Sequence, residues 1–252
     1  GYTTSVVLVK LGWPLTLGIP IALMLSSLFG LILGFFARHL RGVYVAMLSF
    51  AAAQMIYEIL IGWDSFLGGT DGLLGIPKAT LAIAPSIVLD ISTPQRYYYF
   101  CLFILVVSLY VMHRILDSPF GHVLVAIREN ELRVRFLGYP VNRYKMLAFL
   151  ASGLFSGLAG ALFASLDRFV SPQIGHWLLS GEVILIMLIG GMGTLLGPLI
   201  GAVFFVYLRE LLTDYTDRWL LVLGIIFVLI VIFLPKGIYD PVRRLVGQKN
   251  DT

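Results

Sequence analysis

The chain has 252 residues, of which 59% are hydrophobic and only 13% are charged, with a formal net charge of +4 and a mean hydropathy of +0.93. A soluble domain carries about 25% charged residues, so this composition excludes an ordinary soluble protein and indicates an integral membrane protein. The apolar runs are continuous, which predicts an all-α, multi-span fold. The basic residues flank these runs and form no stripe on a soluble domain, so we do not expect nucleic-acid binding.

The first residues read as the end of a membrane span. The chain begins Gly1-Tyr2-Thr3 without a methionine, and the apolar run Val6 to Val9 follows. The pattern of a cleavable signal, a basic region followed by a short apolar core, is not found there. We therefore expect an N-terminal truncation that removed at least part of one span.

The next two spans are predicted at Ile19 to Ala37 and at Val43 to Gly62. Gly30 and Gly34 stand at small-xxx-small spacing in the first of them, which allows a close approach of helices. A basic turn at residues 38–42 joins the two spans. Because Lys and Arg prefer cytoplasmic loops, we expect this turn inside the cell.

Gln54 and Glu58 share one face of the second of these spans, because they stand four residues apart on a helix. An ionisable residue at the centre of a span costs roughly 2.5 kcal/mol or more, so such a residue usually faces a cavity or a partner. The pair is therefore a candidate for the substrate pathway. Glu58 also lies close to the span end at Gly62, so a solvated or helix-paired glutamate is an equal interpretation.

A long loop, Asp64 to Arg96, follows and is rich in glycine near residues 68–72. Long loops without structure are uncommon, so we expect part of this one, Leu81 to Leu89, to lie along the membrane surface. A run of tyrosines at residues 97–99 then leads into the span Phe100 to Met112.

A polar, charge-dense segment, Ser118 to Lys145, interrupts the apolar sequence. Ser118-Pro119 predicts the start of a helix and Gly138 its end. Charges at Arg128 to Glu131 interrupt the apolar face between them, so we expect one bent helix or two short ones against the inner membrane surface. The positive-inside rule places the whole loop, residues 113–145, in the cytoplasm.

Two interpretations of this segment stand side by side. It is either a basic interfacial loop that fixes orientation in the lipid, or a surface for a soluble protein partner. Glu129 and Glu131 would weaken a purely lipid-binding patch, and their mixture with arginines favours the protein partner.

The span Met146 to Leu166 is predicted to be a packing helix, because it carries several glycines at close spacing. Ser152 and Ser156 lie in it and are candidates for the pathway. Hydrogen bonding across packed helices is the interpretation that we favour for these two serines.

The last third of the chain predicts a broken, re-entrant helix near residues 181–212, because the apolar run is interrupted by glycines. A single crossing there would place the basic C-terminal tail outside, against the positive-inside rule. We expect a half-helix after Ser180 with Glu182 in its first turn, and a final span from Trp219 to Leu234.

The glycines of this break are candidates for the pathway, because broken helices often lie beside a transport path. Tight packing of helices explains the same glycines equally well. The candidate positions are Gly190, Gly191 and Gly193.

Enzyme chemistry finds little support in the sequence. The histidines have no metal-ligand spacing, the single Cys101 lies in an apolar run, and no nucleophile–base arrangement stands out. No GxxxxGK[ST] motif is present, so we expect no ATP site, no metal and no cofactor on this chain.

Several motifs together resemble the permease subunit of an ABC importer for branched-chain amino acids, the LivM-type family. The motifs cover nearly the whole chain and are FGHVLVAIRENE with FLGY, KMLAFLASGLFSGLAGAL, SGEVILIMLIGGMGTLLGPLIGA, FLPKGI and GWDSFLGGTDGLLGIP. The family has two further N-terminal spans, which again implies truncation. His122 and the run at residues 133–136 depart from the family pattern.

The resemblance implies a single permease domain over residues 1–252 in a bacterial inner membrane, paired with a second permease subunit. Two cytoplasmic ATPase subunits, which carry ATP and magnesium, would drive it, and a periplasmic protein would deliver the substrate. The segment coupled to the ATPases would comprise Arg128, Glu129, Asn130, Glu131 and Gly138.

The substrate implied by the resemblance is a branched-chain or other hydrophobic amino acid. The FGHVLVAIREN and RVRFLGY motifs are also similar to the urea-permease branch, so a urea or short-amide permease is the alternative. HWLLSGEV is closer to the amino-acid branch. The alternative hypothesis outside the transporters is a membrane-embedded enzyme or a structural scaffold.

Overall fold

A computed structural model gives the structure of the chain and describes residues 1–40, 42–77, 80–84, 87–90, 93–191, 193–215, 218–233 and 237–238. The contacts divide the chain into two compact units, Gly1–Trp177 and Leu178–Thr252. The prediction of a single domain over residues 1–252 stays a prediction.

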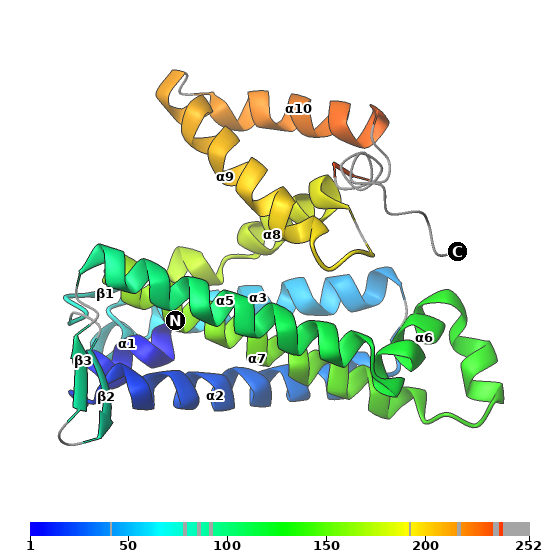
Figure 1. The fold of residues 1–252 in the computed structure, drawn as a ribbon, viewed down its shortest axis with the longest axis horizontal. Helices are drawn as coiled ribbons and strands as arrows, with labels where there is room; N and C mark the ends of the chain where they lie inside the picture. The colour runs from blue at the N-terminus through cyan, green and yellow to red at the C-terminus, as the bar shows by residue number, and fades with distance from the viewer. Residues whose placement is uncertain are drawn as a thin grey trace. The chain divides into compact units, whose positions relative to one another are not determined.

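The first unit contains most of the secondary structure (Figure 1). Its helices are α1 (Tyr2–Val9), α2 (Leu15–Ala37), α3 (Val43–Gly62), α4 (Asp64–Leu67), α5 (Pro94–Leu116), α6 (Pro119–Phe136) and α7 (Val141–Asp167). Its short 3₁₀ turns are η1 (Gly69–Asp71) and η2 (Pro172–Gly175), and its strands are β1 (Leu73–Leu74), β2 (Thr80–Ala84), β3 (Ile87–Asp90) and β4 (Phe169–Val170). Helix α8 (Trp177–Gly190) begins at its last residue.

Helices α2 and α7 form the central pair of the first unit, because small residues let their backbones touch. A side chain built on Gly30 would meet the carbonyl of Phe149, and one built on Gly153 would meet the carbonyl of Ser26. Gly157 likewise lies against the Ser26 side chain. These contacts run in opposite directions along the two helices, so the pair is antiparallel. The predicted packing role of the glycines in both spans is confirmed.

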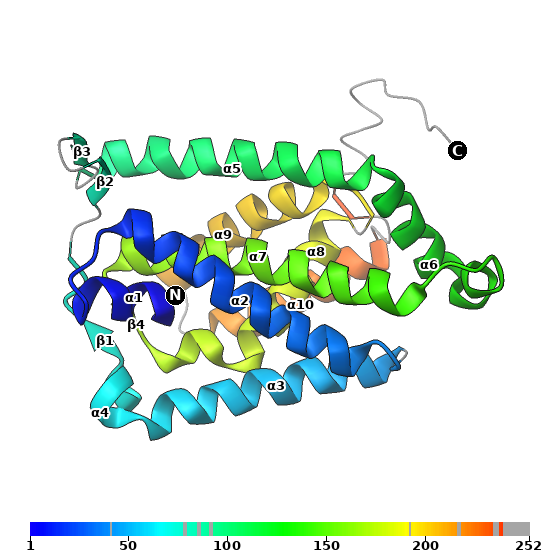
Figure 2. The ribbon, with the colours of Figure 1, turned by 90° about the horizontal axis from the view of Figure 1, so that it is seen from below.

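The other two long helices lie on opposite sides of this pair, as Figure 2 shows for α3 and α5. Helix α3 packs on η2, where the ring of Tyr57 meets the ring of His176 edge-on at 4.9 Å. Helices α2, α3, α5 and α7 are each long and apolar enough to cross a membrane. The predicted all-α integral membrane fold is confirmed.

The two ends of the first unit differ in structure (Figures 1 and 2). Strands and α1 gather at one end, and α6 lies at the other, together with the turn after α2. A buried cluster stabilises the strand end, where β1 pairs antiparallel with β4. Its members are Leu8, Leu15, Ile76, Tyr97, Ala164 and Val170.

The second unit contains most of α8, α9 (Gly197–Tyr215) and α10 (Trp219–Phe233). Ile189, Phe205 and Leu223 form its buried cluster, one residue from each helix. The predicted broken helix is confirmed, because α8 ends at Gly190 and α9 begins only at Gly197.

Several boundaries differ from the prediction. Helix α8 begins at Trp177 and not after Ser180, so Glu182 lies beyond the first turn and Ser180 caps nothing. Helix α5 is longer at both ends than the predicted span Phe100 to Met112. Helix α5 is longer because flanking residues continue a helix that the apolar run has already nucleated, and α8 starts earlier because residues 177–179 extend its apolar run.

Part of the long loop between α3 and α5 folds as a β-hairpin. The strands β2 and β3 pair antiparallel, with Leu81 opposite Leu89. Its predicted position along the membrane surface stays a prediction. The basic tail at Arg243 and Arg244 lies outside the described residues.

Candidate functional site

The charge-dense segment of the sequence folds as α6, and Asn130 kinks this helix. Ser118 caps its start, since the Gly121 N–H donates to Ser118 Oγ at 3.3 Å. Asn130 leaves the helical region, with φ −156° and ψ 94°, and its Oδ1 accepts a hydrogen bond from the Arg133 N–H at 3.0 Å. Asparagine is a preferred N-cap, so Asn130 starts a second half-helix. Gly138, with φ 85°, follows its end, and the predicted bent helix is confirmed.

Glu131, the next residue, turns its carboxylate toward α7. Lys145 Nζ donates to Glu131 Oε2 at 2.8 Å, and Arg135 Nη2 donates to Oε1 at 2.9 Å. Lys145 also reaches the carbonyl oxygen of Leu40, in the turn after α2, at 3.5 Å. The side chains of Glu131 and Lys145 are only 16% and 19% exposed, so solvent screens this ion pair less than a surface pair.

Packing contacts fasten α6 to its neighbours on either side of the kink. Before the kink, the ring of Phe120 stacks on that of Tyr144 in α7, with centroids 5.6 Å apart and planes 17° apart. Gly121 lies so close to the carbonyl of Leu116 that a side chain would not fit. After the kink, Val134 is buried, as is Val141 at the start of α7. The helix is therefore held at both halves.

The remaining surface of α6 is exposed and mixes charge with apolar side chains. Arg128 and Glu129 are exposed, and Phe136 and Leu137 are 89% and 70% exposed. A shallow groove beside the kink is lined by Asn130, Leu132, Arg133, Phe136 and Leu137. Exposed large apolar side chains next to charges are typical of an interaction surface.

Gln54 and Glu58 are brought together on α3, as predicted from their spacing. Gln54 Nε2 donates to Glu58 Oε1 at 2.9 Å. Glu58 is exposed and Gln54 is half-buried, and the Gln54 Oε1 atom is buried without a hydrogen-bond partner in the part of the chain that the structure describes. The pair therefore places a carboxylate and an amide side by side on an otherwise apolar helix. Its place in a substrate pathway stays a prediction.

Ser152 and Ser156 are exposed on α7, each directly before a glycine that contacts α2. These glycines are Gly153 and Gly157. Hydrogen bonding of the two serines across packed helices stays a prediction. They are free to face a solute or another chain.

At the glycine-rich break between α8 and α9, the backbones of the two helices lie in direct contact. Gly191 and Gly193 have φ of 112° and 95°, which L side chains rarely adopt. Helix α9 turns back across α8, so that a side chain on Gly201 would meet the carbonyl of Ile186 and the backbone of Gly190. Packing and backbone turning thus both require glycine here.

A second contact at this break was not foreseen. The Ile238 N–H donates to the carbonyl oxygen of Ile189 at 2.8 Å and satisfies one of the last carbonyls of α8. Gly237, with φ 76°, lies against the backbone of Gly191. The only sequence signal for this contact is the Gly237-Ile238 pair after the last span. Ile189 lies too far away in the sequence for local patterns to predict that the two segments pair.

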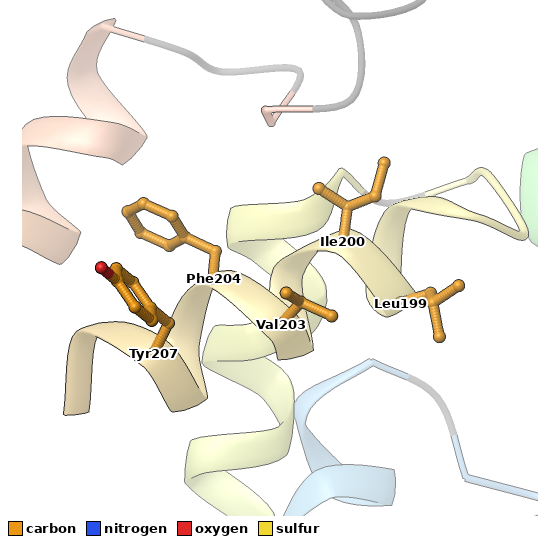
Figure 3. A pocket seen from close by; sticks show the side chains of 5 residues that line it. All are labelled: Leu199, Ile200, Val203, Phe204 and Tyr207. Carbon is orange, nitrogen blue, oxygen red and sulfur yellow. The ribbon is translucent and has the colours of Figure 1, made fainter. Parts of the chain in front are cut away.

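A shallow apolar groove runs along α9 in the second unit. Figure 3 shows the side chains that line it, which are Leu199, Ile200, Val203, Phe204 and Tyr207. Apart from the Tyr207 hydroxyl, these side chains offer no polar group to a ligand, so the groove suits lipid tails or an apolar helix better than a polar solute.

The family match and two curated relatives all point to one class of permease. A family described as "Branched-chain amino acid transport system / permease component" matches residues 1–231. The chain belongs to this permease family. It is 32% identical to the high-affinity branched-chain amino acid transport system permease protein LivM of Escherichia coli (strain K12), over 92% of this chain and 59% of that protein. The LivM protein of Salmonella typhimurium is equally similar, at 32% identity over 92% of this chain and 59% of its own length.

A more distant similarity links the chain to another permease. It is 30% identical to the autoinducer 2 import system permease protein LsrC of Enterobacter sp., over 73% of this chain and 54% of that protein. No solved structure matches. The chain thus spans about three fifths of the length of the curated LivM proteins it matches.

The resemblance noted in the sequence is therefore confirmed at the level of the family. The family match, together with four apolar helices of spanning length, indicates that the chain is a multi-pass permease component of the inner membrane. Among the described residues, no group of three His, Cys, Asp or Glu side chains is placed to hold a metal ion.

Proposed function

We propose that this chain is the membrane permease subunit of an ABC importer for branched-chain or other hydrophobic amino acids, driven by separate ATPase subunits. The observation that carries the proposal is the exposed face of α6. It combines charges at Arg128 and Glu129 with an apolar pair, Phe136 and Leu137, at the end of the first unit opposite the strands. A loop that only oriented the protein in lipid would have no need of a rigid, capped and kinked helix.

The partner that fits this face is a cytoplasmic ATPase subunit. An exposed apolar side chain can fill a pocket on the partner protein, and ion pairs at the edge of the interface then fix the orientation of the two proteins. Arg128, Glu129 and Asn130 supply the polar part, and Gly138 ends the helix sharply behind them. ATP and magnesium would be held by the partner, because this chain has no phosphate-binding motif.

The substrate class is proposed from the relatives and from the chemistry of the pathway candidates. The LivM proteins match more of the chain, and at slightly higher identity, than the autoinducer 2 permease. A zwitterionic amino acid needs dipoles and a few polar groups, which Gln54, Glu58, Ser152, Ser156 and the backbone at Gly190, Gly191 and Gly193 can supply. A periplasmic binding protein would deliver it, and a second permease subunit would complete the path.

Docking of the ATPase is tested by removing the most exposed aromatic side chain of α6. Replacing Phe136 with Ala is expected to weaken ATPase binding about 30-fold, because a buried aromatic anchor contributes about 2 kcal/mol or more to an interface. The measurement is the affinity of the purified ATPase subunit for the detergent-solubilised permease. The matched control is Tyr215→Ala, which removes an aromatic side chain that is 85% exposed on α9. Equal affinities of the two variants would contradict the proposed docking face.

The substrate is tested by uptake into proteoliposomes that contain the complete transporter. We expect labelled leucine to accumulate on ATP addition, and unlabelled isoleucine and valine to compete with it. Urea is expected not to compete, because it carries neither the charges nor the apolar side chain of an amino acid. Uptake of urea, with no competition from amino acids, would instead support the short-amide alternative.

A further inference from the structure

Glu131 differs from the other charged residues of α6 in where its side chain lies. Arg128 and Glu129 point to solvent, whereas the Glu131 carboxylate is 16% exposed and uses both oxygens, one toward Arg135 and one toward Lys145. The Arg135 bond stays within the second half of α6. The Lys145 bond leaves the helix and reaches α7. A carboxylate occupied in this way is poorly placed to bind a soluble partner.

Lys145 extends the connection to a third element. Its Nζ donates to Glu131 Oε2 at 2.8 Å and contacts the Leu40 carbonyl oxygen at 3.5 Å. The second half of α6, the start of α7 and the turn after α2 therefore meet at one ammonium group. An ion pair with little exposure keeps more of its strength than one in open water.

The helices at the far end of this connection pack with their backbones in contact. Gly30 and Gly153 let the backbones of α2 and α7 touch, so one helix cannot slide without displacing the other. A displacement of the second half of α6 would reach both helices, because Lys145 belongs to α7 and bonds Leu40 in the turn after α2. The kink at Asn130 divides α6, so that the half beginning at Glu131 is the one bonded to Lys145.

From these contacts we infer that Glu131 is a positioning residue, which transmits movement of the second half of α6 to the α2–α7 pair through Lys145. It is not part of the docking face. This inference rests on the proposed function, because it assigns the route by which an ATPase bound to α6 moves the membrane helices. The docking face is then Arg128, Glu129 and the exposed apolar side chains, and Glu131 is the link behind it.

The test measures solute transported per ATP hydrolysed, in proteoliposomes that hold the wild-type or variant permease with its ATPase subunits. Glu131→Gln keeps the shape of the side chain and removes the charge. We expect ATPase binding within about twofold of wild type and a fall in leucine transported per ATP of about fivefold or more. The ratio is unaffected by the amount of folded protein, so a purely structural loss would not change it.

Two further variants sharpen the comparison. Lys145→Gln removes the charge of the other partner and is expected to lower the ratio about as much as Glu131→Gln. The double variant Glu131→Gln with Lys145→Gln is expected to lower it no further than the larger of the two single effects, because both substitutions break the same link. The control is Asp117→Asn, which removes an exposed carboxylate whose ion pair with His113 lies within the end of α5. We expect Asp117→Asn to transport with the wild-type ratio.

The outcomes separate the inference from the function on which it rests. A wild-type complex that neither binds ATPase nor transports a solute would overturn the proposed function and the inference together. A Glu131→Gln complex that transports with the wild-type ratio would overturn the inference alone. Weakened ATPase binding with an unchanged ratio would return Glu131 to the docking face and likewise overturn it. If Glu131→Gln fails to fold, a well-folded Lys145→Gln chain that transports with the wild-type ratio would also overturn it.

Discussion

Gly153→Leu is expected to destabilise the chain by about 1–3 kcal/mol or more, because overpacking at a well-packed contact forces backbones apart. A side chain at this position meets the backbone of Ser26 and Ser27 in α2. The carbonyl groups that it meets cannot rotate away as a side chain could. The measurement is the midpoint of unfolding of the purified chain in detergent, by heat or by added denaturing detergent.

The matched control for this prediction is Gly62→Leu at the end of α3. Nothing lies within 4 Å of a side chain built there. Both substitutions replace glycine by leucine in a helix and gain a similar intrinsic propensity, about 0.8 kcal/mol or less. The difference between the two midpoints therefore isolates the contact between α2 and α7. Two variants with the same midpoint would show that this contact does not hold the pair together.

Gly191→Leu is expected to lower uptake at least about tenfold, because a leucine at φ 112° is strained by about 1–3 kcal/mol. The glycine break would then lose its turn, and with it the backbone groups proposed for the pathway. Uptake of labelled leucine into proteoliposomes measures the effect, and binding of the ATPase to α6 is expected to persist.

The control for the break is Gly224→Leu in α10, a glycine in the same unit with nothing within 4 Å of an added side chain. Uptake by this variant is expected to remain close to wild type. Normal uptake by a well-folded Gly191→Leu chain would contradict the assignment of the break to the pathway. The glycines would then serve packing alone.

The membrane helices and the kinked helix were predictable from local patterns. The apolar runs alone predicted α2, α3 and α7 to within a few residues, since burying an apolar run in lipid requires a helix that satisfies its own backbone. Ser118-Pro119 and Gly138 marked the ends of α6, because an N-cap, a proline and a left-handed glycine act within one turn. The interruption of its apolar face at Arg128 to Glu131 predicted one bent helix or two short ones, and the structure places the bend at Asn130.

The contacts that give these elements their proposed roles were not predictable in the same way. Which residues of α7 contact α2 depends on the side that α2 occupies, and the pattern of serines and glycines alone did not say that Gly153 and Gly157 contact it while Ser152 and Ser156 stay exposed. The hairpin in the long loop depends on pairing between strands whose sequence signal is weak. The bond from Ile238 to Ile189 joins segments separated by a whole helix pair.

By itself, the sequence determined that this protein is a multi-span helical membrane protein with one charged, capped helix and one glycine-broken helix, because hydropathy, capping and glycine conformation act over a few residues. Only the tertiary structure decided that Glu131 faces Lys145 and Leu40 while Glu129 faces solvent. The two glutamates stand two positions apart in one charged run. Their difference arises from the kink and from the start of α7, which the chain brings beside them only when it has folded.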